Sequence, residues 1–118
     1  YYIIYKDLIL NYDDIVSNLM QELRRGTLII VVLSQLKKEE YGYNLITKLK
    51  ENGITVEANT LYPLLRRLEN QGLLKSEWNT KEYKPRKYYS ITKDGKEVLK
   101  KFIHHWKDFS SNVNKIID

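Results

Sequence analysis

The sequence contains no cysteine, only two prolines and five glycines, and no long apolar segment. Without cysteine the chain forms neither disulfides nor thiolate metal sites, and nothing in it indicates secretion. Its longest apolar run, Leu28–Leu33, is far shorter than the roughly 18 residues that a membrane-spanning helix needs. We therefore expect a cytoplasmic protein that does not associate with a membrane.

Catalytic patterns are also missing from the sequence. No Ser-His-Asp arrangement and no glycine-rich phosphate motif is visible. The two histidines, His104 and His105, are adjacent, so on a helix their side chains diverge by about 100° and cannot share a metal ion. We expect no catalytic residues, no metal and no cofactor, and therefore no enzyme.

The 118 residues suffice for one domain with one hydrophobic core. The net charge of +5 and the pI of about 9.3 favour a polyanionic partner, although many ordinary proteins are equally basic. The distribution is more informative, because ten of the twenty lysines and arginines lie between Lys75 and Lys107, several of them beside tyrosines. This part of the chain is where we expect contact with a polyanion.

The segment Glu57–Gly72 has a clear helical pattern. Four leucines recur at i, i+3, i+4 and i+7, on one stripe of a helix: Leu61, Leu64, Leu65 and Leu68. The polar side chains point away from that stripe: Asn59, Pro63, Arg66 and Asn70, with Arg67 nearby. Amide and guanidinium groups on such a helix suit insertion into a nucleic-acid groove, and a solvated surface helix is the alternative. Gly72 is expected to end the helix in the left-handed conformation.

Another helix is predicted just before this segment. It opens at Tyr41–Tyr43, buries Leu45, Ile46 and Leu49, and ends at Asn52-Gly53, after which Ile54–Val56 crosses in an extended form. Two helices joined by so short a link are typical of a helix-turn-helix, with the second in the recognition position. Pro63 leaves the start of that second helix open. With Thr60 as N-cap the proline lies in the first turn, whereas with Glu57 as N-cap it kinks the helix.

The N-terminal part is predicted to be helical from Asp13 or Asp14, either of which is expected as the N-cap. The apolar run in Thr27–Leu36 fits a buried strand or a buried helix, and the helical pattern before it favours a helix, with Gly26 as a weak point. Lys37–Glu40 is expected to be a charged link. Residues 1–19 are interpreted as either an upstream extension or a native arm that packs on a partner subunit. We favour the arm, because so much apolar surface rarely stays in water.

Two alternating segments, Leu74–Asn79 and Arg86–Thr92, predict a β-hairpin with Thr80–Pro85 as its loop. The sequence around this loop contains a single acid, Glu82, and four basic residues: Lys81, Lys84, Arg86 and Lys87. A basic hairpin beside a helix-turn-helix is typical of a wing that contacts phosphates or the minor groove. A hairpin tip whose charges only prevent edge pairing is the alternative.

The last helix is predicted to run from its N-cap, Thr92, to about Ile117. Its apolar residues step by 3, 4, 3, 4 and 3, as in an a/d heptad seam: Leu99, Phe102, Trp106, Phe109, Val113 and Ile116. At 1.5 Å per residue the helix is about 37 Å long, which exceeds what a small winged domain covers. We therefore expect the excess to pair with a second copy of the chain, and docking on the domain's own core is the alternative.

Four blocks of the sequence together resemble the PadR family of winged helix-turn-helix transcriptional regulators. They are LRRGTLIIVVLSQL (Leu23–Leu36), YGYNLITKL (Tyr41–Leu49), NTLYPLLRRLENQGLL (Asn59–Leu74) and RKYYSITKDGKEVL (Arg86–Leu99). The resemblance covers about residues 20–109, and the short C-terminus is similar to that of the smaller members. Two features depart from the family pattern: the long N-terminal stretch, and Glu57–Asn59 in place of a helix start that bears proline or glycine.

The resemblance implies a mostly α-helical fold with a small β-hairpin wing. Residues 20–92 would form the DNA-binding domain, and residues 93–118 a dimerisation helix. It implies a homodimer that binds a palindromic operator in double-stranded DNA and represses transcription. The residues expected to contact DNA are Tyr43, Asn59, Thr60, Tyr62, Arg66, Arg67, Lys81, Lys84, Arg86 and Lys87, among which Asn59 and Arg66 suit base edges and Tyr43 suits a core role equally.

Some small members of that family bind planar aromatic compounds at the dimer interface. The resemblance thus implies a second hypothesis, a ligand site formed by Phe102, Trp106 and Phe109. A winged-helix module that binds proteins without DNA affinity is a third hypothesis, and it would need neutral residues on the recognition face and the wing.

Overall fold

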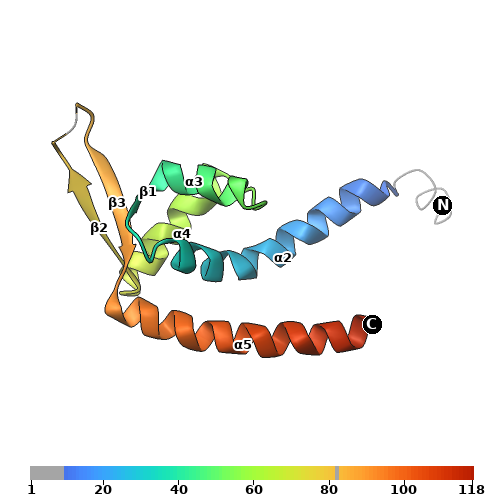
Figure 1. The fold of residues 1–118 in the computed structure, drawn as a ribbon. Coiled ribbons are helices and arrows are strands. Elements are labelled where there is room, and N and C mark those ends of the chain that lie inside the picture. Colours follow the sequence, from blue (N-terminus) through green and yellow to red (C-terminus); the bar gives the residue numbers. More distant parts are fainter. Residues whose placement is uncertain (1–9, 82) are drawn as a thin grey trace.

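The structure is a computed structural model, which describes residues 10–81 and 83–118. Along the chain it has helix α2 (Tyr12–Gln35), strand β1 (Glu40–Tyr41), helices α3 (Gly42–Glu51) and α4 (Ala58–Asn70), strands β2 (Leu74–Asn79) and β3 (Arg86–Ile91), and helix α5 (Lys93–Ile117) (Figure 1). This order confirms the predicted class, a mostly helical winged helix-turn-helix with a long last helix. What was expected of residues 1–9 lies outside the described residues.

Helix α2 is a single helix of 24 residues. It includes Leu28–Leu33, so the prediction of a helix in place of a strand is confirmed, and it passes through Gly26 without a break. The predicted cap was wrong, because the N-cap is Asn11, whose side-chain oxygen accepts the N–H of Asp14 at 3.1 Å. Asp13 and Asp14 lie in the first turn, where carboxylates interact favourably with the helix dipole.

Three strands form one antiparallel sheet in the order β1-β3-β2. The pairing of β2 with β3 runs from Leu74 opposite Ile91 to Asn79 opposite Arg86, which confirms the predicted hairpin. Strand β1 was not predicted. The segment Lys37–Glu40 was expected to be a charged link, but Glu40 and the following Tyr41 pair with β3. A strand of two residues has no alternation of its own, so only its pairing partner reveals it. This pairing places the start of α3 beside the hairpin.

Thr92 joins the hairpin to the start of α5. Its hydroxyl oxygen accepts the N–H of Gly95 at 2.9 Å, which confirms it as the N-cap. The same hydroxyl donates to the carbonyl of Gly72 at 2.6 Å, and the Thr92 N–H donates to the carbonyl of Leu73 at 3.0 Å. The first turn of α5 is therefore attached directly to the segment that follows α4.

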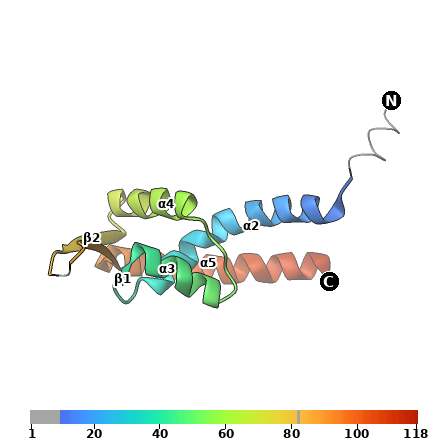
Figure 2. The ribbon, with the colours of Figure 1, turned by 90° about the horizontal axis from the view of Figure 1, so that it is seen from above.

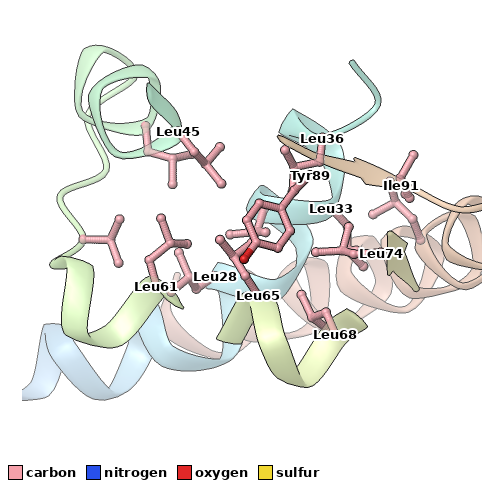
Figure 3. Close-up of a cluster of buried hydrophobic side chains, with 14 residues drawn as sticks. Leu28, Leu33, Leu36, Leu45, Leu61, Leu65, Leu68, Leu74, Tyr89 and Ile91 are labelled. Carbon is pink, nitrogen blue, oxygen red and sulfur yellow. The ribbon is translucent and has the colours of Figure 1, made fainter. Parts of the chain in front are cut away.

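The hydrophobic core lies where the four helices meet one face of the sheet (Figure 3). It is dominated by leucines from several elements, and α4 contributes Leu61, Leu65 and Leu68. Leu99 of α5 also belongs to it and is only 2% exposed. The expected seam with a second chain therefore has to be corrected at its first position, because Leu99 is already covered by its own domain.

The molecule is elongated, with extents of 62 × 36 × 25 Å. The first half of α2 and the second half of α5 extend away from the sheet and the helix-turn-helix (Figures 1 and 2). Both extensions carry large exposed apolar side chains, among them Leu19 and Leu23 on α2 and Phe109 and Ile116 on α5. None of the helices in the described part of the chain combines the length and hydropathy of a membrane span.

Candidate nucleic-acid interface

Helix α4 separates an apolar face from a polar one. Leu61, Leu65 and Leu68 are fully buried, and Leu64 is half-buried. The side chains expected to meet a nucleic acid are all exposed: Asn59, Thr60, Pro63, Arg66, Arg67 and Asn70. The leucine stripe thus fixes the rotation of the helix about its axis, and the amide and guanidinium groups point to solvent as a consequence.

The two ends of α4 are built differently. At its C-terminus Gly72 adopts φ +80°, and the N–H groups of Gly72 and Leu73 donate to the carbonyls of Glu69 at 3.0 Å and Leu68 at 2.9 Å. These paired bonds form a Schellman motif, which confirms the prediction that Gly72 ends the helix in the left-handed conformation. At the other end the N-cap is Glu57, not Thr60, and its side chain makes no capping bond. Pro63 is therefore the sixth residue of a helix that continues through it.

Tyr62 holds α4 against α3. A β-carbon added at Gly42 would lie 2.7 Å from Cε1 of the Tyr62 ring, so the absence of a side chain at Gly42 lets the two helices approach. Burial, together with the nearby Tyr89, raises the pKa of the Tyr62 hydroxyl. Tyr62, which was expected to contact the DNA backbone, is half-buried and packs its ring beside Gly42 at the start of α3.

The hairpin has an inner and an outer face. Leu74, Ser76, Tyr89 and Ile91 lie on the inner face, and Lys87 shares it. The Lys87 ammonium lies 3.9 Å from Oε1 of Glu69 on α4 and 5.4 Å from the centre of the Tyr89 ring. Lys87, which was expected to contact DNA together with the other cations of the hairpin, therefore lies half-buried on the inner face beside α4. Lys81 and Lys84, near the tip, are exposed.

The outer face carries a cluster of tyrosines that the sequence analysis did not identify as a unit. Tyr41 of β1 stacks on Tyr88 of β3 with ring centres 4.2 Å apart, and the Tyr41 hydroxyl donates to the Tyr88 hydroxyl at 2.6 Å. The side-chain amide of Asn79 on β2 donates to the Tyr88 hydroxyl at 3.1 Å. One residue from each strand thus meets here. In the sequence, this cluster was indicated only by two tyrosine-rich motifs, YGY and RKYY.

Arg86 lies over this cluster and connects it to α3. The guanidinium carbon is 5.1 Å from the ring centre of Tyr41 and 5.2 Å from that of Tyr43, distances at which a cation is attracted to an aromatic face. Nη1 of Arg86 also donates to the Tyr43 hydroxyl at 2.6 Å. Tyr43 is exposed, so the alternative of a core role for it is wrong. Instead, Tyr43 and Arg86 form one unit at the loop end of the hairpin, where β3 begins.

Glu40 anchors the same corner of the domain. Its carboxylate forms an ion pair with Lys48 and accepts hydrogen bonds from the Asn44 side chain at 3.1 Å and the Tyr41 N–H at 3.2 Å. Burial alone would raise the pKa of Glu40, but the bonds from Lys48, Asn44 and the Tyr41 amide together lower it. The ionised carboxylate thereby ties β1 to α3, which carries Tyr43.

Comparison with known proteins decides the family. Residues 29–101 match the transcriptional regulator PadR-like family. The chain is 53% identical to a PadR family transcriptional regulator from Eggerthella lenta, whose crystal structure superposes with a TM-score of 0.86 over 91% of this chain and 96% of that one. This protein belongs to the PadR-like family of transcriptional regulators.

Other relatives of this PadR-family protein are more distant. A PadR-like transcriptional regulator from Bacillus cereus is 33% identical, with a TM-score of 0.74 over 82% of this chain and 97% of that one. The transcriptional regulator Rv3488 of Mycobacterium tuberculosis is 35% identical over 81 residues, which are 68% of this chain and 76% of that one. These related proteins are all transcriptional regulators.

A second candidate site of this PadR-family chain lies between α2 and α5. A groove of about 580 Å³ is lined mainly by apolar side chains of both helices, which are Leu23, Ile30, Phe102, Trp106 and Phe109. Gly26 and the polar residues Glu22, Thr27 and His105 complete its lining. The structure thus brings together the three aromatic residues that the family resemblance associated with a ligand. Trp106 is 37% exposed, and apolar walls of this volume are typical of small-molecule sites.

Proposed function

We propose that this protein is a homodimeric repressor whose two α4 helices bind a palindromic operator in adjacent major grooves. The observation that carries the proposal is the division of α4, with Leu61, Leu65 and Leu68 buried while Asn59 and Arg66 face solvent. Amide and guanidinium groups can each form two hydrogen bonds to a purine edge, so these two residues are assigned to base recognition. Thr60, Arg67, Lys81, Lys84 and the Tyr43–Arg86 unit are assigned to phosphates.

The exposed apolar surface supports the proposed homodimer. Val16 and Leu19 on α2, and Phe109 and Ile116 on α5, lie in the two extensions that their own domain does not cover. Large apolar side chains exposed along two neighbouring helices favour an association site, and a second copy of the chain supplies matching helices. The dimerisation helix of the proposal is therefore α5 from Phe102 onwards. A monomer at micromolar concentration in analytical ultracentrifugation would contradict it.

The test of sequence-specific binding begins with selection of bound sequences from random DNA by the purified protein. A palindrome with half-sites one helical turn apart, about 34–36 Å, is the expected result. Arg66→Ala should then cost roughly 1–3 kcal/mol on the selected operator and relax specificity at one base pair. The matched control is Arg67→Ala, which should weaken all sequences equally. Equal losses on operator and random DNA for Arg66→Ala would refute its assignment to a base.

The groove between α2 and α5 favours a second function for the same protein, relief of repression by a planar aromatic ligand. Phe102, Trp106 and Phe109 line it together, and in a dimer the two copies of Trp106 would form its walls. Trp78, the other tryptophan, is 63% exposed on the hairpin and would obscure the signal, so the assay uses a Trp78→Phe background. A planar tricyclic dye should quench the fluorescence of Trp106 saturably. Unchanged quenching after Trp106→Phe in otherwise wild-type protein would exclude the groove.

A further inference from the structure

We infer that Arg24 and Arg25 of α2 form an additional phosphate contact, at the end of α4 that lies farthest from the hairpin. This inference rests on the proposed function, because it adds a residue pair to the same DNA interface. Neither arginine was singled out by the sequence pattern, which attributed the phosphate contacts to α4, the hairpin and Tyr43. What places them at the interface is their position beside the first turn of α4.

A shallow groove of about 330 Å³ joins α2 to the start of α4. One side is formed by a stripe of α2 that includes Arg24, Arg25, Leu28 and Val31. The other side is formed by residues 54–57, which lead into α4, and by Thr60 in its first turn. The two guanidinium-bearing residues and a residue already assigned to DNA thus line one surface.

The rotation of α2 about its axis accounts for this placement. Leu28 is 7% exposed and belongs to the core, and Arg24 and Arg25 precede it by four and three residues. Residues at these spacings lie on the same side of a helix, so burial of Leu28 turns both arginines toward α4. Leu23 and Gly26 face the α5 groove instead. The arginines therefore belong to the α4 side of α2 and not to the aromatic groove.

The charges around this groove also favour an anion. Glu57 is the only acid that lines it, so with Arg24 and Arg25 the groove carries a net positive charge. Both arginines are exposed, and neither forms an ion pair with any residue in the described part of the chain. Glu57 alone would repel a phosphate near the start of α4. The two arginines reverse the sign of the charge at that end of the helix.

The dimensions of α4 fit a contact at each of its ends. Its 13 residues span about 20 Å, and the major groove of B-DNA is about 12 Å wide between its two backbones. Figure 2 shows α4 extending from the hairpin at one end to the middle of α2 at the other. With Lys81 and Lys84 near one backbone, Arg24 and Arg25 are placed near the other. Since α2 also leads to the proposed dimer surface, their phosphates lie on the inner side of each half-site.

The inference is tested with the double variant Arg24→Gln/Arg25→Gln of the full chain. Its binding to the selected operator is measured by fluorescence anisotropy over a series of salt concentrations. Each lost phosphate contact should reduce the slope of log K against log salt by about 0.9, so a dimer with two contacts per subunit loses up to about 4. The base preference should not change. Arg24→Lys/Arg25→Lys keeps both charges and should retain most of the slope.

The matched control is Lys100→Gln/Lys101→Gln, which removes the same charge from an exposed part of α5. It should change the slope much less, because neither lysine lines the groove beside α4, and both lie on α5 well beyond its first turn (Figure 1). An unchanged slope in the arginine variant, or an equal reduction in the control, overturns the inference. Failure of the wild-type protein to bind any operator would refute the proposed function itself, which separates the two outcomes. Circular dichroism of each variant verifies that the helices are intact.

Discussion

Replacement of Gly95 by alanine is expected to destabilise the fold even though alanine is the better helix former. Gly95 is buried in the first turn of α5, and a β-carbon there would lie 2.1 Å from the carbonyl oxygen of Leu73 and 2.7 Å from Cγ1 of Ile91. The carbonyl cannot easily retreat, because it accepts the N–H of Thr92 at 3.0 Å. Helix α5 would therefore have to move away from the sheet.

The magnitude follows from two opposing terms. Alanine in a helix is favoured over glycine by about 0.5–1 kcal/mol, whereas an extra carbon forced into a packed interior costs typically about 1–3 kcal/mol. Because 2.1 Å is far below any van der Waals contact, the cost should lie at the upper end and leave a net loss of about 2 kcal/mol. Gly26 in the middle of α2 provides the control, since a β-carbon there meets nothing within 4 Å. Gly26→Ala should therefore stabilise by about 0.5–1 kcal/mol.

The assay is urea unfolding followed by far-UV circular dichroism, at one fixed protomer concentration because dimerisation adds to apparent stability. The two glycine-to-alanine changes should shift the midpoint in opposite directions. If Gly95→Ala unfolds at the same urea concentration as the wild type or a higher one, α5 does not approach the Leu73 carbonyl as closely as described.

Three further predictions concern single side chains. Tyr43→Phe removes the hydroxyl that holds Arg86 and should lower operator affinity by about 0.5–1.5 kcal/mol on every sequence, whereas a loss confined to one base pair would assign Tyr43 to base recognition. Glu40→Gln should lower the free energy of unfolding by about 1 kcal/mol near pH 7. Because the folded pKa of Glu40 lies below its usual 4.5, this loss should persist above pH 4.5 and vanish as pH falls through the folded pKa. A difference in unfolding free energy that stays constant down to pH 2 would contradict this. Pro63→Ala returns a donor to the Asn59 carbonyl and should raise the melting temperature, with up to about 3 kcal/mol of stabilisation; a lower melting temperature would show that the proline ring is needed where it lies.

The elements that could be predicted from the sequence are those with a periodic apolar pattern. The leucine stripe of α4 and the length of α5 depend on spacing within one segment, and both were predicted correctly. The α4 cap stayed open between Thr60 and Glu57, because Thr60 is the better capping residue by type, whereas Glu57 caps the helix without a side-chain bond. A cap without a side-chain bond cannot be recognised from residue type. The two-residue strand β1 cannot be recognised from the sequence either, because it is defined only by its pairing with β3.

For the candidate site, exposure was easier to predict than contacts. Arg66 and Asn59 were expected on the outer face of α4 and lie there, since the helical period decides it. Lys87 shows the opposite case. Its alternation with Tyr89 and Ile91 puts Lys87 on the inner face of the hairpin, whereas its charge led us to expect a phosphate contact. The acid that binds it, Glu69, lies 18 positions earlier on α4, and only the folded chain brings the two together.

The attachment of α5 to the end of α4 determines how a ligand could act. Thr92 bonds to Gly72, Leu73 and Gly95, so a shift in the first turn of α5 is transmitted to the segment that ends α4. The aromatic groove lies farther along the same α5, where the proposed dimer forms. A ligand there releases DNA only if it binds more tightly to a dimer in which the two α4 helices no longer match successive major grooves. Tight binding that leaves the spacing between the α4 helices unchanged would have no effect on the operator, however many contacts the groove supplied.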